Sequence, residues 1–211
     1  MENAASTCVI VFAKAPIEGQ AKTRLIPAIG ATAATQLYCA MVHKALKTAT
    51  QAGLGQVILC CAPDEHHDFF ATCARKYNVM LMSQSGGDLG TRMFDALHQG
   101  LQKYACALII GTDCPALSMS DLCDAAAALT SHEVVVVPAE DGGYVLIGAA
   151  RADARLFNDI AWSGPHVMRD TRRNVDLMGW RVKELHMLWD VDVPADLQRL
   201  AEAGIFVPLC K

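Results

Sequence analysis

Basic side chains gather in one short segment near the start of the chain. Lys14, Lys22 and Arg24 fall within eleven positions that also contain Pro16 and Gly19. Fixed cations and backbone N–H groups supply the charge-assisted hydrogen bonds that phosphate oxygens accept, and an arginine can bind them bidentately. The pattern predicts a loop that wraps a diphosphate, although it lacks the G-x-x-x-x-G-K-[ST] spacing of a P-loop. A solvated basic loop is the alternative.

A single acid closely follows a strongly apolar run in the middle of the chain. Asp113 comes after the run 108–110, where a strand is expected to end. A buried carboxylate is costly unless it is paired, and Mg²⁺ or Mn²⁺ bridging to phosphate oxygens is a common partner. We therefore predict that Asp113 is a metal ligand and a catalytic residue. Two alternatives remain open: Asp113 caps the helix expected near Ser118, or it pairs with Lys14 or Lys22.

Two further acids alternate in the sequence Trp-Asp-Val-Asp-Val-Pro. In an extended segment, Asp190 and Asp192 point to the same side. Two carboxylates that face one way favour a cation, so either can complete the metal shell that begins with Asp113. Asp192 is preferred because it stands close to Pro194, which begins the last predicted helix. The alternative is that Asp192 only caps that helix.

The segment 138–144 leaves a run of four valines, turns, and enters another apolar run. Gly142 and Gly143 suit a tight turn with positive φ, and a hairpin turn alone would explain them together with Asp141. Glu140 is not needed for a turn and could act as a general base or bind an acceptor. We predict catalytic roles for Glu140 and Asp141, and nucleotide contacts for the two glycines.

A second glycine-rich segment, 84–92, lies between a predicted strand and a predicted helix. Glycines let a flat base or ribose approach the backbone closely, and Arg92 in the first helical turn can reach an anion. The nucleotide-binding residues predicted from this segment and from the first loop are Ala13, Lys14, Ala15, Pro16, Gly19, Lys22, Arg24, Gln84, Gly90 and Arg92.

Histidines offer one further candidate. His166 is expected in the first turn of a helix, where it could face an acceptor, so we include it among the catalytic residues; a purely structural role is the alternative. His66 and His67 are adjacent and therefore point in different directions on a helix, which indicates a surface position rather than a metal cluster.

The elements that position these residues follow from hydrophobic periodicity. Predicted strands cover 7–13, 56–62, 79–82, 105–111, 133–138, 144–149 and 180–185. Predicted helices cover 32–51, 64–76, 90–103, 118–129, 165–178 and 194–203, with Ser118, Ser120 and Ser163 as N-cap candidates. Runs that are apolar on both faces indicate central strands with helices on both sides. The sequence predicts a single α/β domain, residues 1–211.

Composition excludes several classes of partner. The 211 residues carry a formal net charge of -4, whereas a nucleic-acid-binding protein needs clustered Lys and Arg. The first apolar run is too short for a signal peptide, and no later run approaches the roughly 20 residues that cross a bilayer. None of the nine cysteines forms a C-x-x-C pair. We expect a cytoplasmic protein with reduced thiols that binds neither nucleic acid nor membranes.

Together these segments resemble one bacterial family. The motifs that carry the resemblance are Phe-Ala-Lys-Ala-Pro-x-x-Gly-x-x-Lys-Thr-Arg-Leu, Gly-Asp-Leu-Gly-x-Arg-Met, Gly-Thr-Asp-Cys-Pro-Ala-Leu, Glu-Asp-Gly-Gly-Tyr, Trp-Ser-x-Pro-His-Val and Trp-Asp-Val-Asp-x-Pro. They are similar to the DUF2064, or transferase 1, family of the nucleotide-diphospho-sugar transferase superfamily, over about residues 9–200.

The resemblance implies a GT-A-like, Rossmann-type three-layer α/β/α sandwich with a mostly parallel central sheet. It places Asp113 where the superfamily has its metal-binding acid. The D-x-D motif is only partly matched, since Gly111 stands two positions before Asp113, so Asp192 or Asp190 must supply the second carboxylate. The first loop is also similar to 2-phospholactate guanylyltransferases, and Gln84 with the Leu-Gly-Thr that follows it is similar to uridylyltransferases.

We therefore expect a transferase that depends on Mg²⁺ or Mn²⁺ and moves a glycosyl group from a nucleotide sugar to a small-molecule acceptor. One alternative is a nucleotidyltransferase that uses a nucleoside triphosphate and a phosphorylated acceptor. The other is a nucleotide-binding module without turnover. A homodimer is compatible with each of these, and the sequence leaves the donor, the acceptor and the stereochemistry open.

Overall fold

A mostly parallel sheet forms the centre of the computed structural model, which describes residues 7–205. The strands are β1 (Thr7–Lys14), β2 (Val57–Ala62), β3 (Met80–Ser83), β4 (Cys106–Ile110), β5 (Val134–Pro138), β6 (Tyr144–Ala149) and β7 (Val182–Glu184). They lie in the order β3-β2-β1-β4-β6-β5-β7 within one sheet. Neighbouring strands are parallel except where β6 pairs with β4 and with β5.

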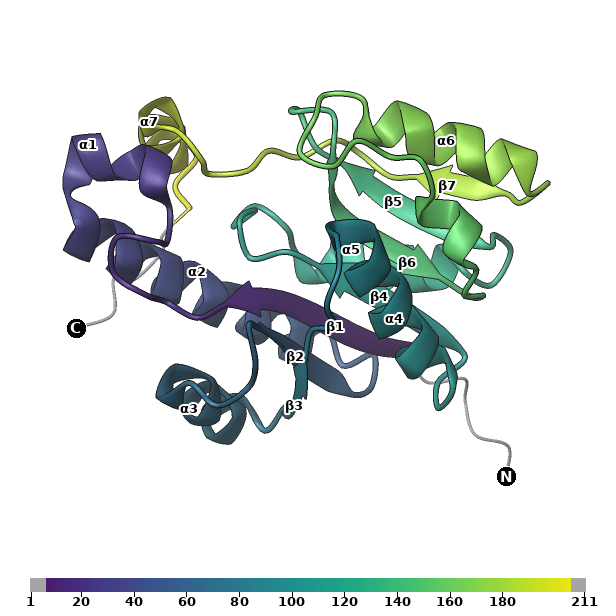
Figure 1. Ribbon diagram of the computed structural model, residues 1–211, viewed down its shortest axis with the longest axis horizontal. Coiled ribbons are helices and arrows are strands. Elements are labelled where there is room, and N and C mark those ends of the chain that lie inside the picture. The colour runs from purple at the N-terminus through teal and green to yellow at the C-terminus, as the bar shows by residue number, and fades with distance from the viewer. Residues whose placement is uncertain (1–6, 206–211) are drawn as a thin grey trace.

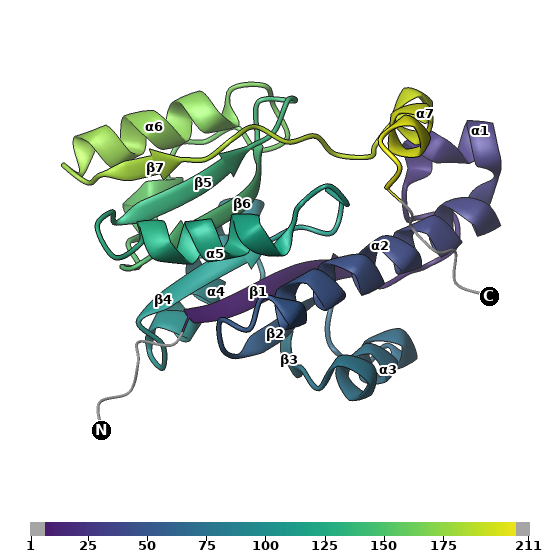
Figure 2. The same ribbon diagram turned by 180° about the vertical axis from the view of Figure 1, so that it is seen from behind.

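Helices cover both faces of this sheet. The α-helices are α1 (Ile26–Ile29), α2 (Ala31–Gln51), α3 (Asp68–Tyr77), α4 (Leu89–Leu101), α5 (Met119–Ala128), α6 (Val167–Leu177) and α7 (Pro194–Glu202), and the short 3-10 helices are η1 (Thr23–Leu25) and η2 (Ala154–Phe157). One face packs against α4, η2 and α6, and α4 stands in front of the sheet in Figure 1. The opposite face packs against α2, α3 and α5, and α2 and α5 stand in front in Figure 2. This confirms the predicted three-layer α/β/α sandwich.

The alternation of strand side chains explains why both faces are covered. In β1, Val9 and Val11 point into the core beneath α2, whereas Cys8 and Ile10 point into the core beneath α4. All four are completely buried. A strand that is apolar on both faces is stable only inside a sheet with helices on either side. The sequence patterns of the central strands therefore required this layering.

A third apolar cluster lies away from the sheet, at the end of the molecule where α1 and α7 stand together in Figure 1. Leu25 of η1, Met41 of α2, Leu200 of α7 and Val191 from the segment before α7 meet there. Leu25 and Val191 are completely buried. This cluster fixes the basic first loop and the last acidic segment relative to each other.

Most predicted element boundaries are close to the observed ones, and two expectations about helices were wrong or incomplete. The helix predicted from 165 begins at Val167, with His166 as its N-cap. Ser163, the predicted cap, has a φ of 67° instead of the extended backbone of an N-cap. The short α1 was not predicted. The N-cap of α5 is Ser118, which forms a capping box with Asp121.

None of the cysteines within residues 7–205 forms a disulfide. Within the same residues, every helix is too short or too polar to cross a bilayer.

A substitution in β6 tests the packing of the sheet. A methyl group at Gly148 would collide with Leu108 and would lie 2.8 Å from Val135. Neither neighbour can move easily inside a filled core, so Gly148→Ala should lower the free energy of unfolding by about 1–3 kcal/mol. Denaturant unfolding measures this loss.

The matched control is Gly86→Ala, because nothing lies within 4 Å of a methyl group at that position. It should leave the free energy of unfolding almost unchanged. Equal effects of the two substitutions would contradict the described packing around β6.

Candidate active site

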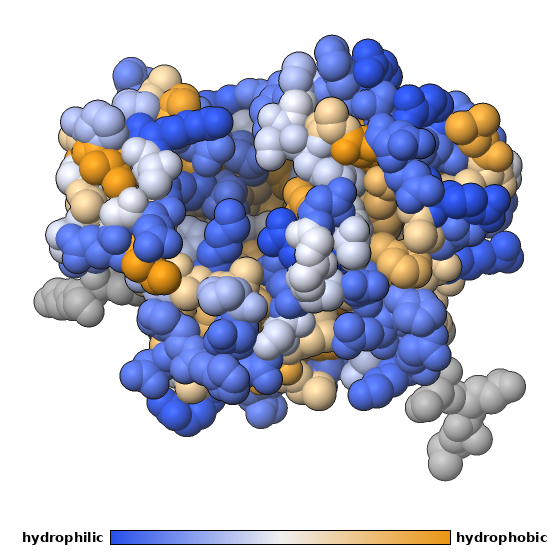
Figure 3. All heavy atoms as spheres, viewed as in Figure 1, coloured by the Kyte–Doolittle hydropathy of each residue, from blue (hydrophilic) through white to orange (hydrophobic). Residues whose placement is uncertain are grey.

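A cleft of about 980 Å³ opens at the edge of the sheet where the parallel strands have their carboxyl ends. This is the position at which open α/β sheets bind ligands. Figure 3 shows a hollow between the end of the molecule that contains α1 and α7 and the part that contains α6, with mostly hydrophilic residues at its rim. The predicted site residues that line the cleft are Ala13, Lys14, Ala15, Lys22, Arg24, Gln84, Arg92, Asp113, Asp141, Gly143, Asp190 and Asp192.

The ammonium group of Lys22 is the centre of the acidic part of the cleft. Its Nζ lies 2.7 Å from Oδ1 of Asp113, 3.0 Å from Oδ1 of Asp192 and 2.7 Å from the carbonyl oxygen of Val191. A lysine ammonium has three donors, and here each has one acceptor. Only 4% of the Lys22 side chain is exposed, compared with 48% for each of the two aspartates.

This arrangement decides between two of the alternatives for Asp113. Asp113 does not cap α5, whose N-cap is Ser118, but pairs with Lys22. Two distant carboxylates, one after β4 and one before α7, therefore converge on a single cation position. The sequence left open which cation would occupy it.

The last acidic segment reaches this position by pairing with the sheet. Leu188 donates its N–H to the carbonyl of Pro138 at 2.9 Å, so the chain runs alongside the end of β5. Val191 then donates its N–H to the carbonyl of Asp113 at 2.8 Å. Because Val191 points into the third apolar cluster, the flanking Asp190 and Asp192 point into the cleft, as the alternation predicted.

The charges of this cluster shift the pKa values of its members. Burial alone would lower the pKa of the Lys22 ammonium, but Asp113 and Asp192 outweigh that effect and raise the pKa above its ordinary value. Burial raises the pKa of Asp190 to about 7, with the charges of Asp113 and Asp141 adding to the effect. The cleft therefore holds more acidic groups than its buried lysine can balance.

The three aspartates predicted as metal ligands do not form a ready-made cage. Across residues 7–205, no group of three or more His, Cys, Asp or Glu side chains is placed to hold a metal ion. Asp113 and Asp192 both contact the Lys22 ammonium, whereas Asp190 makes no contact with it within 4.0 Å. Asp192 is not the cap of α7 either, because Val193 is the N-cap and the Asp196 carboxylate accepts the N–H groups of Asp192 and Val193.

The start of the first loop is held through the backbone of Lys14. Tyr38 of α2 donates its hydroxyl to the carbonyl of Lys14 at 3.0 Å and accepts the N–H of Lys14 at 2.7 Å. The Lys14 side chain is exposed at the mouth of the cleft. Arg24 is 73% exposed and lies 3.6 Å from Oδ2 of Asp192. Pro16 and Gly19 do not line the cleft.

The turn after β5 has a structural role as well as a place in the site. Gly142 has a φ of 90°, and a methyl group there would collide with the backbone of Pro165. Asp141 accepts the N–H of Gly143 at 2.9 Å, and both residues line the cleft. Gly142 does not line the cleft. The close approach of its backbone to that of Pro165 explains why a glycine stands at this position.

Glu140, predicted as a catalytic residue, points away from the cleft. Both of its carboxylate oxygens accept hydrogen bonds from Arg199 of α7, at 2.6 and 2.7 Å, and Arg199 stacks on the ring of Trp189. The hydrogen bonds from Arg199 lower the pKa of Glu140. A general base works best with a pKa near the working pH, so this pairing does not favour that role.

The second glycine-rich segment forms the opposite wall of the cleft. Gln84 donates to the carbonyl of Cys60 at 3.0 Å and accepts from Arg92 at 3.2 Å. A methyl group at Gly90 would lie 2.7 Å from the ring of Trp162. Gly90 therefore makes room for an indole that lines the cleft, rather than for a ligand.

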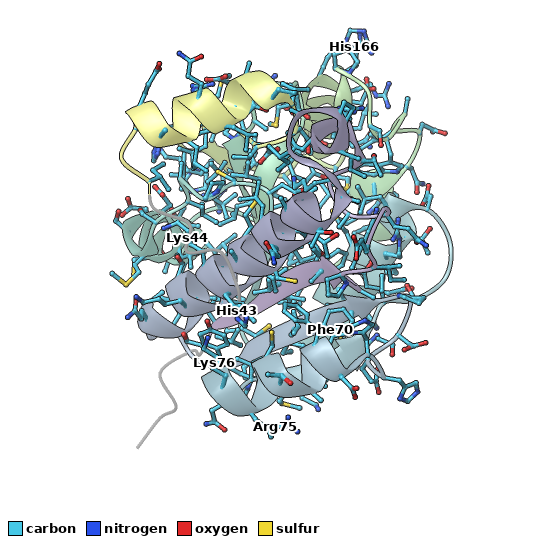
Figure 4. The ribbon with its side chains drawn as sticks, turned by 90° about the vertical axis from the view of Figure 1, so that its left-hand side faces the viewer. His43, Lys44, Phe70, Arg75, Lys76 and His166 are labelled. Atoms are coloured by element: carbon cyan, nitrogen blue, oxygen red, sulfur yellow. The ribbon has the colours of Figure 1, made fainter. Side chains whose placement is uncertain are left out.

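The histidines lie outside the cleft. His166 is exposed at the periphery of the molecule, and its ring points outward in Figure 4. His66 and His67 are exposed, and Nδ1 of His67 accepts the N–H of Phe69 at the start of α3. The surface position expected for this pair is confirmed.

Sequence reasoning missed two aromatic residues of the site. Tyr38 occupies an apolar position of α2, so no pattern distinguishes its hydroxyl from an ordinary core contact. Trp162 begins the Trp-Ser-x-Pro-His-Val motif, but the motif does not indicate what its indole ring contacts. Its pairing with Gly90 is separated by more than seventy positions and follows only from the fold.

Known proteins place this chain in a family. The model of the family described as "Uncharacterized protein conserved in bacteria (DUF2064)" matches residues 45–164. The chain belongs to the DUF2064 family. The matched segment contains Gln84, Arg92, Asp113 and the turn at 140–143. No curated protein matches the chain.

Solved structures confirm the GT-A-like fold. A protein from Desulfovibrio desulfuricans G20, provisionally assigned as a nucleotide-diphospho-sugar transferase, has 27% identity and a TM-score of 0.86, with 94% of this chain and 87% of that chain covered. A 4-diphosphocytidyl-2C-methyl-D-erythritol synthase from Anaerococcus prevotii has 12% identity and a TM-score of 0.63, over 96% and 99% of the chains. Rv0371c from Mycobacterium tuberculosis H37Rv, solved with manganese, has 20% identity and a TM-score of 0.55, over 95% and 100%.

The pKa of Asp190 gives a test of the electrostatics of the cleft. An unfolded aspartate titrates near pH 4, whereas the folded carboxyl has a pKa of about 7. The wild-type protein should therefore lose stability between these values as the pH rises, because the folded state must release a proton that it holds more tightly. The amide of Asp190→Asn is neutral throughout. In thermal unfolding of the ligand-free protein, the variant should gain a few degrees more over the wild type at about pH 8 than at about pH 5.

The control is Asp124→Asn, which removes an exposed carboxylate of α5. Its effect on the Tm should be the same at both pH values. If the effect of Asp190→Asn on the Tm is also the same at both pH values, the raised pKa of Asp190 is contradicted.

Proposed function

We propose that this chain is a metal-dependent transferase that uses a nucleotide-diphosphate donor, most specifically a glycosyltransferase that acts on a small acceptor. The observation that carries the proposal is the convergence of Asp113 and Asp192 on one cation position inside the cleft. The cleft is large enough for a nucleotide and lies where this fold class binds ligands. We treat residues 1–211 as one domain with this activity.

The carboxylates at this position fit Mg²⁺ or Mn²⁺. Magnesium sites in transferases use one or two carboxylates together with substrate phosphates and water, rather than a complete protein cage. Asp113 and Asp192 supply two such oxygens, and Asp190 adds negative charge nearby. A cation bound there would neutralise the charge that develops on the leaving nucleoside diphosphate.

The cations of the first loop and of α4 are placed to bind the donor. Lys14, Arg24 and Arg92 line the same cleft. Within the described residues, neither Lys14 nor Arg92 forms a salt bridge. Arg92 donates to Gln84 and to the carbonyl of Asp88, which leaves further N–H groups for phosphate oxygens. Gln84 and Ala13 border the part of the cleft beside the ends of β1 and β3, where we place the nucleoside.

The acceptor would lie against the wall formed by Asp141, Gly143, Tyr144 and Trp162. In glycosyl transfer, the acceptor hydroxyl oxygen forms a bond to the anomeric carbon as the bond to the diphosphate oxygen breaks. We assign the released proton to Asp141, because only its Oδ1 is used by the N–H of Gly143. The catalytic roles of Glu140 and His166 remain predictions, and neither residue lines the cleft.

Nucleotidyl transfer is the second candidate function. A phosphate of the acceptor would attack the α-phosphorus of a nucleoside triphosphate, and pyrophosphate would leave. The free cations at the cleft mouth suit a triphosphate, and the fold also occurs in a CMP:2-keto-3-deoxy-manno-octonic acid synthetase complexed with CTP, at 13% identity and a TM-score of 0.55. The third hypothesis, a nucleotide-binding module without turnover, predicts that the protein binds a nucleotide but forms no product.

Ligand binding separates these candidates. With Mn²⁺ present, a nucleotide sugar at 100 times its Kd should raise the free energy of unfolding by about 2.7 kcal/mol, which a thermal-shift screen detects as a higher Tm. Isothermal titration should then give tighter binding for a diphosphate sugar than for any triphosphate. Tighter, metal-dependent binding of a triphosphate would favour nucleotidyl transfer instead.

The role of Asp113 is tested with the donor identified by that screen. Asp113→Asn should lower kcat by at least about 100-fold, since it removes a carboxylate that we assign to the cation. Its Tm should remain within a few degrees, because Asp192 and Val191 still accept from Lys22. The control Asp176→Asn changes an exposed residue of α6 and should retain full activity. Retained turnover in Asp113→Asn would reject the metal role.

A further inference from the structure

The Lys22 ammonium stands where the two metal-site carboxylates meet. It contacts the same oxygen of each, Oδ1 of Asp113 at 2.7 Å and Oδ1 of Asp192 at 3.0 Å. The side chain is almost completely buried, and each of its three donors has an acceptor. This is a formed site with a cation already in it, and the cation belongs to the chain itself.

A divalent cation cannot enter this position while Lys22 remains in it. Both need the space between the two carboxylates, and two positive charges at such a short separation repel each other. The ammonium therefore competes with the metal for the same oxygens. This argument rests on the proposed function, because it takes Asp113 and Asp192 as the metal ligands.

The surroundings of Lys22 allow it to leave. Its backbone has a φ of 48°, in the left-handed region that non-glycine residues seldom adopt, and it precedes η1 in the exposed first loop. Lysine carries its charge on a flexible four-carbon stem. Besides the other two aspartates of the cleft, Asp141 and Asp190, a displaced ammonium would meet the phosphates of the bound donor.

We infer that Lys22 is an exchangeable internal counter-ion. In the ligand-free protein it holds Asp113 and Asp192 together and suppresses the binding of free Mg²⁺ or Mn²⁺. When a nucleotide diphosphate binds together with its cation, Asp113 and Asp192 would hold that cation and the Lys22 ammonium would move to the phosphates. Metal binding and nucleotide binding are coupled through this one side chain.

Metal affinity without nucleotide tests the inference. Titration of Mn²⁺ into nucleotide-free protein, followed by calorimetry and by the electron paramagnetic resonance signal of free Mn²⁺, should show at least tenfold tighter binding to Lys22→Met than to the wild type. Lys14→Met is the matched control, because Lys14 lines the same cleft and forms no salt bridge within residues 7–205. Its affinity for Mn²⁺ should change less than threefold.

The outcomes separate this inference from the proposed function. If Lys22→Met binds Mn²⁺ no more tightly than the wild type, but both bind it at a site that Asp113→Asn abolishes, the counter-ion role is overturned and the metal site stands. If neither protein binds Mn²⁺ without nucleotide, the counter-ion role is overturned, and the metal role of Asp113 is decided by the turnover of Asp113→Asn. Tighter binding to Lys22→Met alone supports the exchange.

A measurement on the wild-type protein covers the case in which Lys22→Met does not fold. Reductive methylation followed by mass spectrometry reports the reactivity of each lysine. Lys22 should be protected without metal and become several-fold more reactive in excess Mg²⁺, whereas Lys14 should be unaffected. Lys22 that stays protected while Mg²⁺ binds would show that the ammonium does not leave, and would overturn the inference.

Discussion

The candidate site depends on the pairing of one buried ammonium with two carboxylates. Lys22, Asp113 and Asp192 come from three segments that are far apart in the sequence, and Nζ of Lys22 lies 2.7 Å from Asp113 and 3.0 Å from Asp192. Burying an ammonium group costs several kcal/mol unless its partners are well placed. The Lys22 ammonium repays this cost by using all three donors. Any change that separates these segments leaves a charge buried without its partner, so the site and the local fold are stabilised together.

The wider fold serves this arrangement in two ways. The parallel strands β1 and β4 bring the basic loop and Asp113 to the same edge of the sheet, because the carboxyl ends of parallel neighbours lie together. The chain after β7 pairs with the end of β5 at Leu188, but its acidic part, 190–192, is not a strand of the sheet. It is held instead by Val191, which is buried in the apolar cluster with Leu25 and donates its N–H to Asp113. The apolar contact behind the segment thus determines where its charged side chains point.

The sequence predicted the layers of the fold well and the contacts of the site only in part. Runs such as 134–137 are apolar on both faces, so their central place in the sheet follows from hydrophobicity alone. The hairpin turn considered at 138–144 agrees with the antiparallel pairing of β5 and β6. The antiparallel pairing of β6 with β4 and the contact of Glu140 with Arg199, across 59 positions, depend on tertiary structure, and no local pattern indicates them. The same limit applied to Lys22: the sequence offered a phosphate contact or a pairing with Asp113, but its burial and its second partner, Asp192, appear only when three segments are brought together.

The central claim is that Asp113 and Asp192 hold a divalent cation at the position that Lys22 occupies without ligand. The most direct measurement is a crystal structure of the protein with Mn²⁺ and the donor nucleotide, with the metal located by anomalous scattering. The account predicts one manganese peak bonded to both carboxylates, with Lys22 moved onto the phosphates. A manganese ion bound elsewhere, with Lys22 still between the two aspartates, would contradict it.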